Sequence, residues 1–324
     1  MKNYSKKLST ILLAGIGALS ISCESGILAP KGNINDDSAK QGSLTFSMTD
    51  APIDGSNVSA AFVTVTEIKV DGQTFSGFKG PKTVNVLALQ NGNSLNLGNG
   101  NVAAGTYSKM ELILDIENDA SKAGPGCYVL KTDGTKDKLE FGGKSQAAIT
   151  LKPKYFKVDE NGSTEIIMDF DLRKSIKSSG YDFSFVTNNE MEAAIRAENR
   201  SRTGAIKGKI DNYTTSQGNV LIYAYKKGTF NANSETKGSG SSNVTFAKAV
   251  TSSKVNADGT FSLSFLEEGN YELHCQKPQS NGSIIGLNAL LELKSSVDLS
   301  NVGVNAGVQT SVALNFKLDG LLNL

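Results

Sequence analysis

Tryptophan is absent from the 324-residue sequence, and histidine occurs once, as His274. A zinc site with two histidine ligands is therefore excluded. A serine hydrolase would need His274 as its base, and no nucleophile-elbow pattern accompanies it. The neighbouring Cys275 would face the opposite side of a strand, so the two side chains do not form a Cys/His dyad. We therefore assign His274 a structural role.

Signatures of nucleotide and nucleic-acid binding are missing as well. The sequence has no Walker loop and no dinucleotide fingerprint, and the Gly-Ser run at residues 238–242 lacks the lysine and helix of a phosphate loop. Lysine and arginine total 33 against 32 aspartates and glutamates. No basic block follows the leader, so we expect no nucleic-acid partner.

Cysteine is scarce, and the first of three cysteines ends a leader-like segment. Three lysines precede the apolar residues 11–21, a stretch too short for a spanning helix. A small residue before Cys23 at this distance resembles a bacterial lipobox, with the leucine one place further out than usual. The resemblance implies that residues 1–22 are a lipoprotein signal peptide and that lipidated Cys23 anchors the protein to a membrane. Ordinary cleavage that leaves a free Cys23 is the alternative.

The remaining cysteines fall in different halves of the chain. Removal of residues 1–22 takes away three lysines and no acidic residue, leaving 30 basic and 32 acidic residues and a net charge of about −2. An exported compartment would permit a disulfide between Cys127 and Cys275. Because they lie in different predicted domains, we instead expect two separate, half-buried thiols.

Short alternating runs and 33 glycines predict β structure with many turns. Residues 23–41 are polar and aperiodic, which is typical of a tether. Strand patterns fill residues 42–199, and a second set fills residues 204–318. We predict an all-β fold of two tandem antiparallel β-sandwich domains with these boundaries.

Individual segments give more detailed expectations. Strands are predicted at residues 44–48, 60–70, 84–89, 110–116 and 165–172, among others, with a hairpin turn at Asp71-Gly72. Residues 188–199 fit either a helical turn or a last strand. Residues 234–243 look like a flexible loop. Tyr107 and Tyr271 each follow a glycine by two places, a spacing that lets the hydroxyl return to the backbone as in a tyrosine corner.

The ordered motifs GSLTFSMTDAPID, VTVTEIKVDG, LGNGNVAAGTYSKMELIL and IIMDFDLRKSI resemble domain of unknown function family 4382, found in bacterial lipoproteins. The likeness covers about residues 42–199 and implies an exported β domain without an established activity. TGAIKGKI followed by VNADGTFSLSFLEEGNYEL resembles a prealbumin-like or carboxypeptidase regulatory-like sandwich. Such modules are themselves non-catalytic.

Acidic residues provide the candidate sites. Asp50 precedes Pro52, which ends a strand, so its carboxylate is expected to accept hydrogen bonds from backbone amides of the turn. Asp169 and Asp171 are expected on one strand face, where Arg173 could neutralise them. If Asp50 and Asp54 met that pair, an oxygen-rich calcium site would result. No sequence argument places these segments side by side.

We therefore expect an exported, lipid-anchored, non-catalytic binding or assembly module of the bacterial envelope. Its location would be the outer membrane, on the periplasmic face or the cell surface. An envelope protein or a glycan is the expected partner besides the membrane. The alternative is a hydrolase of envelope or extracellular polysaccharide that uses Asp169 or Asp171. The absence of tryptophan counts against it, since sugar sites usually stack rings on aromatic platforms.

Overall fold

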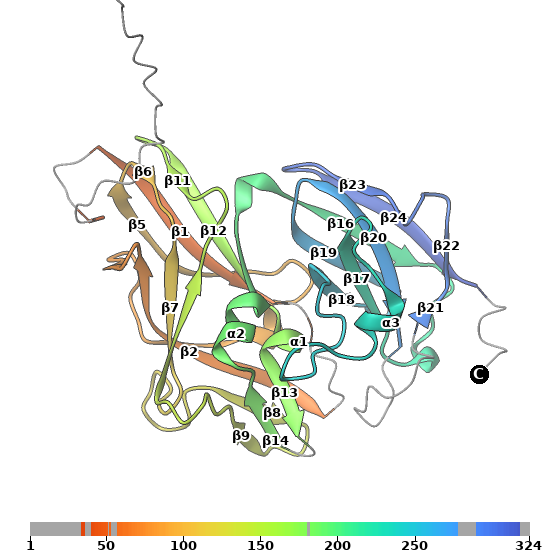
Figure 1. Ribbon diagram of the computed structural model, residues 1–324, viewed down its shortest axis with the longest axis horizontal. Coiled ribbons are helices and arrows are strands. Elements are labelled where there is room, and N and C mark those ends of the chain that lie inside the picture. The colour runs from red at the N-terminus through yellow and green to blue at the C-terminus, as the bar shows by residue number, and fades with distance from the viewer. Residues whose placement is uncertain are drawn as a thin grey trace, which may run out of the picture.

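The computed structural model describes residues 34–35, 40–50, 52, 57–179, 182–277 and 290–317. Within these ranges the protein is mostly β-strand, which confirms the all-β prediction. Figure 1 shows two groups of strands with the short helices α1 (Leu172–Ser175) and α2 (Asn188–Ala194) between them. No helix in the described ranges is long and apolar enough to cross a membrane.

The N-terminal group, here called the first sandwich, has two main sheets. One has the order β15-β12-β1-β5, with β1 Gln41–Thr49, β5 Leu95–Ala103, β12 Ser163–Phe170 and β15 Ile195–Asn199. The other has the order β10-β7-β2-β8-β9, and β3 and β4 also pair with β2. Its strands are β2 Val58–Val70, β3 Gln73–Thr74, β4 Lys82–Asn85, β7 Met110–Asp115, β8 Tyr128–Lys131, β9 Lys136–Lys138 and β10 Gln146–Leu151. Two small ribbons complete it, β6 Gly105–Thr106 with β11 Lys157–Val158 and β13 Ile176–Ser179 with β14 Asp182–Phe185.

Alternation along the strands builds one core between these sheets. In β1 the apolar residues Leu44, Phe46 and Met48 are fully buried, as the period of two requires. The Phe46 ring packs edge-on against Phe75 and Phe156, with centroids 5.1 and 6.1 Å away. Both sheets contribute to the same hydrophobic cluster, so burial of apolar surface holds them face to face.

The C-terminal group, here called the second sandwich, is organised in the same way. One sheet has the order β19-β16-β24-β22, with β16 Thr203–Ile210, β19 Thr260–Glu267, β22 Leu293–Ser295 and β24 Gln309–Phe316. The other has the order β18-β17-β20-β21, and β23 also pairs with β20. Its strands are β17 Leu221–Lys226, β18 Thr251–Lys254, β20 Gly269–Gln276, β21 Leu290–Leu291 and β23 Val302–Val304. A separate cluster of apolar residues fills the space between the two sheets. The pairs β1–β12 and β16–β24 are parallel, so the prediction of antiparallel sheets is wrong at one pair in each sandwich.

Both predicted tyrosine corners are present. The Tyr107 hydroxyl donates to the carbonyl of Ala103, and the Tyr271 hydroxyl donates to the carbonyl of Glu267 over 2.8 Å. Burial raises the pKa of Tyr107 to about 12, with a smaller contribution from Asp71. Burial also raises the pKa of Tyr271, so each phenol stays protonated and keeps its donor role at any physiological pH.

Two segments differ from the sequence-based expectation, and a third resolves an alternative that the sequence leaves open. The predicted strand at 84–89 becomes β4 followed by the 3-10 helix η1 (Val86–Leu89), whose Leu89 carbonyl accepts the Asp50 amide. Residues 188–199 contain both alternatives, since α2 leads directly into β15. The flexible loop predicted at residues 234–243 begins within the last two residues of α3 (Ala232–Glu235), and its Gly-Ser part is hydrogen-bonded to Glu190, as described below. A further 3-10 helix, η3, spans Thr215–Gln217.

The predicted cysteine arrangement holds in part. Cys127 and Cys275 are both free thiols, and both are fully buried rather than half-buried. Burial raises the pKa of the Cys127 thiol to about 12, and its Sγ donates to the carbonyl of Asp115 over 3.3 Å. Neither environment favours a reactive thiolate.

Candidate functional site

Parallel pairing of β1 with β12 brings the acidic candidates together. The register aligns Met48 with Met168 and Thr49 with Asp169, so both strands end at the same edge of the sheet. Asp50 follows there, and its carboxylate Oδ1 accepts the amide of Leu172 over 3.3 Å. The strand thus ends where the sequence predicts. The Asp50 acceptor serves the first turn of α1, whereas residue 51 and residues 53–56, including Asp54, lie outside the described ranges.

The prediction that Asp171 continues the strand face of Asp169 is wrong. β12 ends at Phe170, and Asp171 is the N-cap of α1, where its Oδ1 accepts the amide of Lys174 over 3.3 Å. Aspartate favours this position because its carboxylate satisfies a free amide of the first helical turn. Asp169 therefore lies in a strand and Asp171 lies at a helix N-cap, and their carboxylates have different partners.

Asp171 is the centre of a buried ion-pair group. Its Oδ2 lies 3.0 Å from Arg173 Nη2 and 3.1 Å from Lys174 Nζ, and its side chain is 2% exposed. Burial opposes ionisation, but the two cations outweigh it and keep the pKa of Asp171 below its ordinary value. The expectation that Arg173 neutralises a carboxylate is met for Asp171.

Asp169 pairs with a different arginine. Its Oδ2 lies 2.7 Å from Arg196 Nη2, on the neighbouring strand β15. Sequence reasoning missed Arg196, because only the pairing of β12 with β15 places these residues opposite each other. Within the described ranges, no group of three or more His, Cys, Asp or Glu side chains is arranged to hold a metal ion.

The same arginines connect the two sandwiches. Arg173 Nη1 donates to the carbonyls of Thr245 and Phe246 over 2.6 and 3.0 Å, and Lys174 Nζ donates to that of Ala249 over 3.0 Å. Arg196 Nη1 donates to the carbonyl of Phe265. Each of these cations thus joins a carboxylate of the first sandwich to backbone oxygen of the second, and we call this contact the junction.

A carboxylate of α2 extends the junction. Glu190 forms a capping box with Thr187, the helix N-cap, a motif readable in the sequence as Thr-x-x-Glu. It also accepts the amide and hydroxyl of Ser242 over 2.9 and 2.7 Å, which holds the Gly-Ser loop in place. Burial would raise its pKa, but the hydrogen bonds from Ser242 and Thr187 lower it to about 2.

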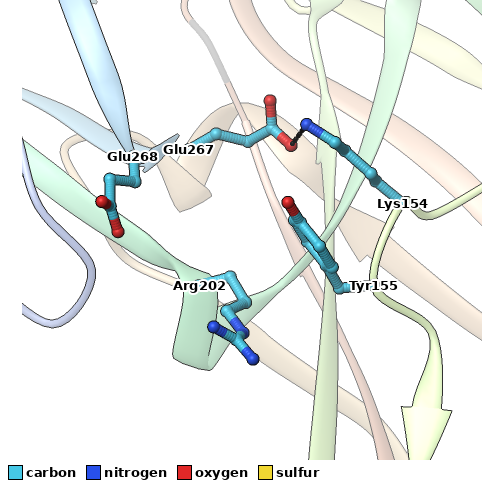
Figure 2. Close-up of a pocket in the computed structure, with 5 residues that line it drawn as sticks. All are labelled: Lys154, Tyr155, Arg202, Glu267 and Glu268. Carbon is cyan, nitrogen blue, oxygen red and sulfur yellow. Dashed lines mark ion pairs between the residues drawn. The ribbon is translucent and has the colours of Figure 1, made fainter.

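A hollow of about 270 Å³ opens at the surface beside the junction. Figure 2 shows its lining, which comes from the loop before β11, the 3-10 helix η2 (Arg200–Arg202), and the end of β19 with the residue that follows it. These segments contribute Lys154, Tyr155, Arg202, Glu267 and Glu268, and we call the site the junction hollow. Sequence reasoning missed it, since its residues are scattered between positions 154 and 268.

A carboxyl group that interacts electrostatically with Glu267 and Lys154 of the hollow has a perturbed pKa. Glu198 of β15 is 12% exposed, and its Oε1 lies 3.8 Å from Arg196 Nη1. Burial raises the pKa of Glu198 to about 7, and Glu267 adds to the effect, while Arg196, Lys226 and Lys154 oppose it. The group therefore exchanges its proton near neutral pH.

The other candidates lie elsewhere. His274 stacks on the Phe230 ring, with centroids 3.6 Å apart, and burial lowers its pKa although Glu272 opposes this. Cys23 lies outside the described ranges.

A calcium test separates the two interpretations of Asp50. We expect Asp50→Asn to retain an acceptor for the Leu172 amide and to cost less stability than Asp50→Ala, which should cost about 1–2 kcal/mol. Thermal melts of the wild type and both variants, with calcium and with a chelator, should show no calcium response. A wild-type melting temperature that rises with calcium, without the same rise in Asp50→Asn, would instead establish a cation site.

Comparison with protein families assigns part of the chain. Residues 41–187 match the family model described as "Domain of unknown function (DUF4382)". The match covers most of the first sandwich and ends before α2. No curated protein matches the chain.

Several solved structures are similar at low identity. The TIE protein of Bacillus anthracis has 11% identity, with 86% of this chain and 34% of that chain covered, and a TM-score of 0.18. BcpA, the major pilin subunit of Bacillus cereus, has 9% identity over 86% of this chain and 70% of that chain, with a TM-score of 0.19. Mfa2, the fimbrial anchor protein of Porphyromonas gingivalis, has 12% identity over 84% and 90%, with a TM-score of 0.18. This chain spans about a third of the length of the TIE protein. At these TM-scores the likenesses support no functional inference.

Proposed function

We propose that this protein is an exported, lipid-anchored, non-catalytic binding or assembly module of the bacterial cell envelope. Cys23 would carry the lipid and hold the protein at the outer membrane, on the periplasmic face or the cell surface. The partner would be an envelope protein or a glycan. The leader sequence before Cys23 supports export, and the resemblance to a lipoprotein family supports a location in the cell envelope.

The buried ion pairs of Asp169 and Asp171 are the observation that supports a non-catalytic function. A hydrolase with paired carboxylates needs one of them to change protonation or to attack substrate. Here each is almost fully buried in an ion pair with its own arginine, at 2.7 and 3.0 Å. The same arginines contact the second sandwich, so the carboxylates stabilise structure at the junction.

A fixed junction suits a binding module. Short polar contacts from α1, α2 and β15 reach two segments of the second sandwich, the loop at residues 242–249 and Phe265 of β19, and Val244 packs against the core of the first. The surface that spans both sandwiches, including the junction hollow, is therefore presented as one preformed unit. Preformed sites bind with less loss of conformational entropy.

Fractionation of cells tests the anchor. We expect Cys23→Ser to move the protein from the membrane fraction to the soluble fraction, because the lipid attachment site is lost. Ser25→Ala, in the same predicted tether, should leave the protein with the membranes. A stable Cys23→Ser protein that still partitions with membranes would rule out the lipid anchor.

A further inference from the structure

Tyr155 is unusually placed for an aromatic residue of this protein. Its side chain is 45% exposed, and it is the one aromatic among the large apolar side chains exposed in the described ranges. Large rings elsewhere in those ranges, such as Phe46, Phe156 and Tyr271, are buried. Tyr155 instead lines the junction hollow, with its hydroxyl directed toward Lys154 and Glu267 (Figure 2). An exposed ring in a hollow offers a flat apolar face to a ligand.

The charges around the ring balance. Lys154 and Arg202 supply two positive groups, and Glu267 and Glu268 supply two negative groups. A phosphate or a polyanion would be repelled by the carboxylates, and a polyamine would be repelled by the cations. The lining therefore favours a neutral ligand that both donates and accepts hydrogen bonds.

The polar groups of the hollow can form further hydrogen bonds to such a ligand. Within the lining, Lys154 Nζ lies 3.6 Å from Glu267 Oε1. This distance exceeds the roughly 2.7–2.9 Å of a direct charge-assisted hydrogen bond. A hydroxyl group can therefore bridge this pair, donating to the carboxylate and accepting from the ammonium group.

A neutral sugar ring combines the required features. Its hydroxyls donate and accept hydrogen bonds around the rim, and its C–H face packs on an aromatic ring. The hollow of about 270 Å³ is near the lower end of ligand-site volumes, which suits one sugar unit. Arg202 and Lys154 lie 5.5 and 5.3 Å from the Tyr155 ring centre, and as exposed cations they are weakly held there and can yield to a stacked ligand.

We propose that the junction hollow binds a neutral pyranose unit of a glycan, with the sugar face on Tyr155 and its hydroxyls on Glu267, Glu268 and Arg202. This inference rests on the proposed function as a binding module, and it names the ligand class. A peptide segment carrying both charges would match the charge balance but would leave the exposed ring face without a role. The sugar is therefore the better fit.

The test uses full-length protein purified in a detergent without a sugar headgroup. The probe is a glycan array carrying neutral, uronic-acid and amino-sugar oligosaccharides, and the strongest hit is then titrated by calorimetry while released sugar is monitored. We expect the strongest hit to be neutral. Tyr155→Ala should weaken its binding at least tenfold, while Tyr155→Phe should stay within about threefold because the ring is retained. Lys152→Ala, at an exposed lysine three positions before Tyr155 and outside the hollow, serves as the matched control and should bind as the wild type does.

Melting temperatures of all variants should match the wild type, since none of these side chains lies in a core. A preference for uronic acids, the absence of any glycan hit, or unchanged binding in Tyr155→Ala would each overturn the sugar site. Capture of a defined envelope protein without glycan binding would also overturn the sugar site, but it would agree with the proposed function as a binding module. Release of free sugar would instead overturn the non-catalytic function, whatever happens at Tyr155.

Discussion

Replacing Asp171 with alanine is expected to destabilise the protein by about 3–5 kcal/mol, the usual cost of leaving buried charges without their counter-ion. Arg173 and Lys174 would both lose the carboxylate that lies 3.0 and 3.1 Å away, and α1 would lose its N-cap. For a protein of this size, the melting temperature should fall by roughly 10 °C. Urea unfolding followed by circular dichroism measures the change.

A matched surface pair provides the control. Asp159 lies 2.6 Å from Lys157, but both side chains are more than half exposed. Asp159→Ala should therefore cost less than about 1 kcal/mol, since solvent screens exposed ion pairs. Similar losses in Asp171→Ala and Asp159→Ala would mean that the buried group contributes little to stability.

The second large effect is a dependence of stability on pH through Glu198. Its pKa rises from 4.5 to about 7 on folding, mainly because burial disfavours the charged form. The folded state therefore binds the proton more tightly, so this contribution to stability is complete below pH 4.5 and is lost as the pH rises through 7. We expect Glu198→Gln, which mimics the protonated group, to be more stable than the wild type at pH 8 by about 2–3 kcal/mol.

Measurements of unfolding at two pH values test the direction of this pH dependence of stability. At pH 4 the wild type and Glu198→Gln should have nearly equal free energies of unfolding, and at pH 8 they should diverge. Glu160→Gln, at an exposed position, should follow the wild type at both values. A Glu198→Gln variant that is less stable than the wild type at pH 8 would show that the charged carboxylate is favoured, through Arg196, Lys226 and Lys154.

Most of the predictions that the structure confirms rest on local sequence patterns. Strict alternation in Leu44, Phe46 and Met48 identifies a buried face without any knowledge of the neighbouring strand. Asp71-Gly72 takes up the positive φ values of 45° and 85° that a two-residue hairpin turn between β2 and β3 requires. Such features depend on a few consecutive residues, so the sequence contains all the information they need.

Long-range pairings account for most of what was missed. Nothing in the alternation of β12 identifies β15 as its neighbour, so Arg196 could not be assigned to Asp169. The carbonyls that accept hydrogen bonds from Arg173 lie more than 70 positions further along the chain, at Thr245 and Phe246. Two features of this region are nevertheless local in the sequence, namely Asp171 as a helix N-cap and the capping box from Thr187 to Glu190.

The two parallel strand pairs have a consequence for the order in which the chain can fold. In the first sandwich, β1 pairs in parallel with β12, and in the second sandwich β16 pairs in parallel with β24. Each pair joins an early strand to one more than a hundred positions later, so closing it requires a large loss of chain entropy. Because β24 lies between β16 and β22, that sheet is complete only after residues 309–316 have left the ribosome. During synthesis this sheet of the second sandwich therefore stays incomplete until β24 has been made, and β16 has no partner on that side until then.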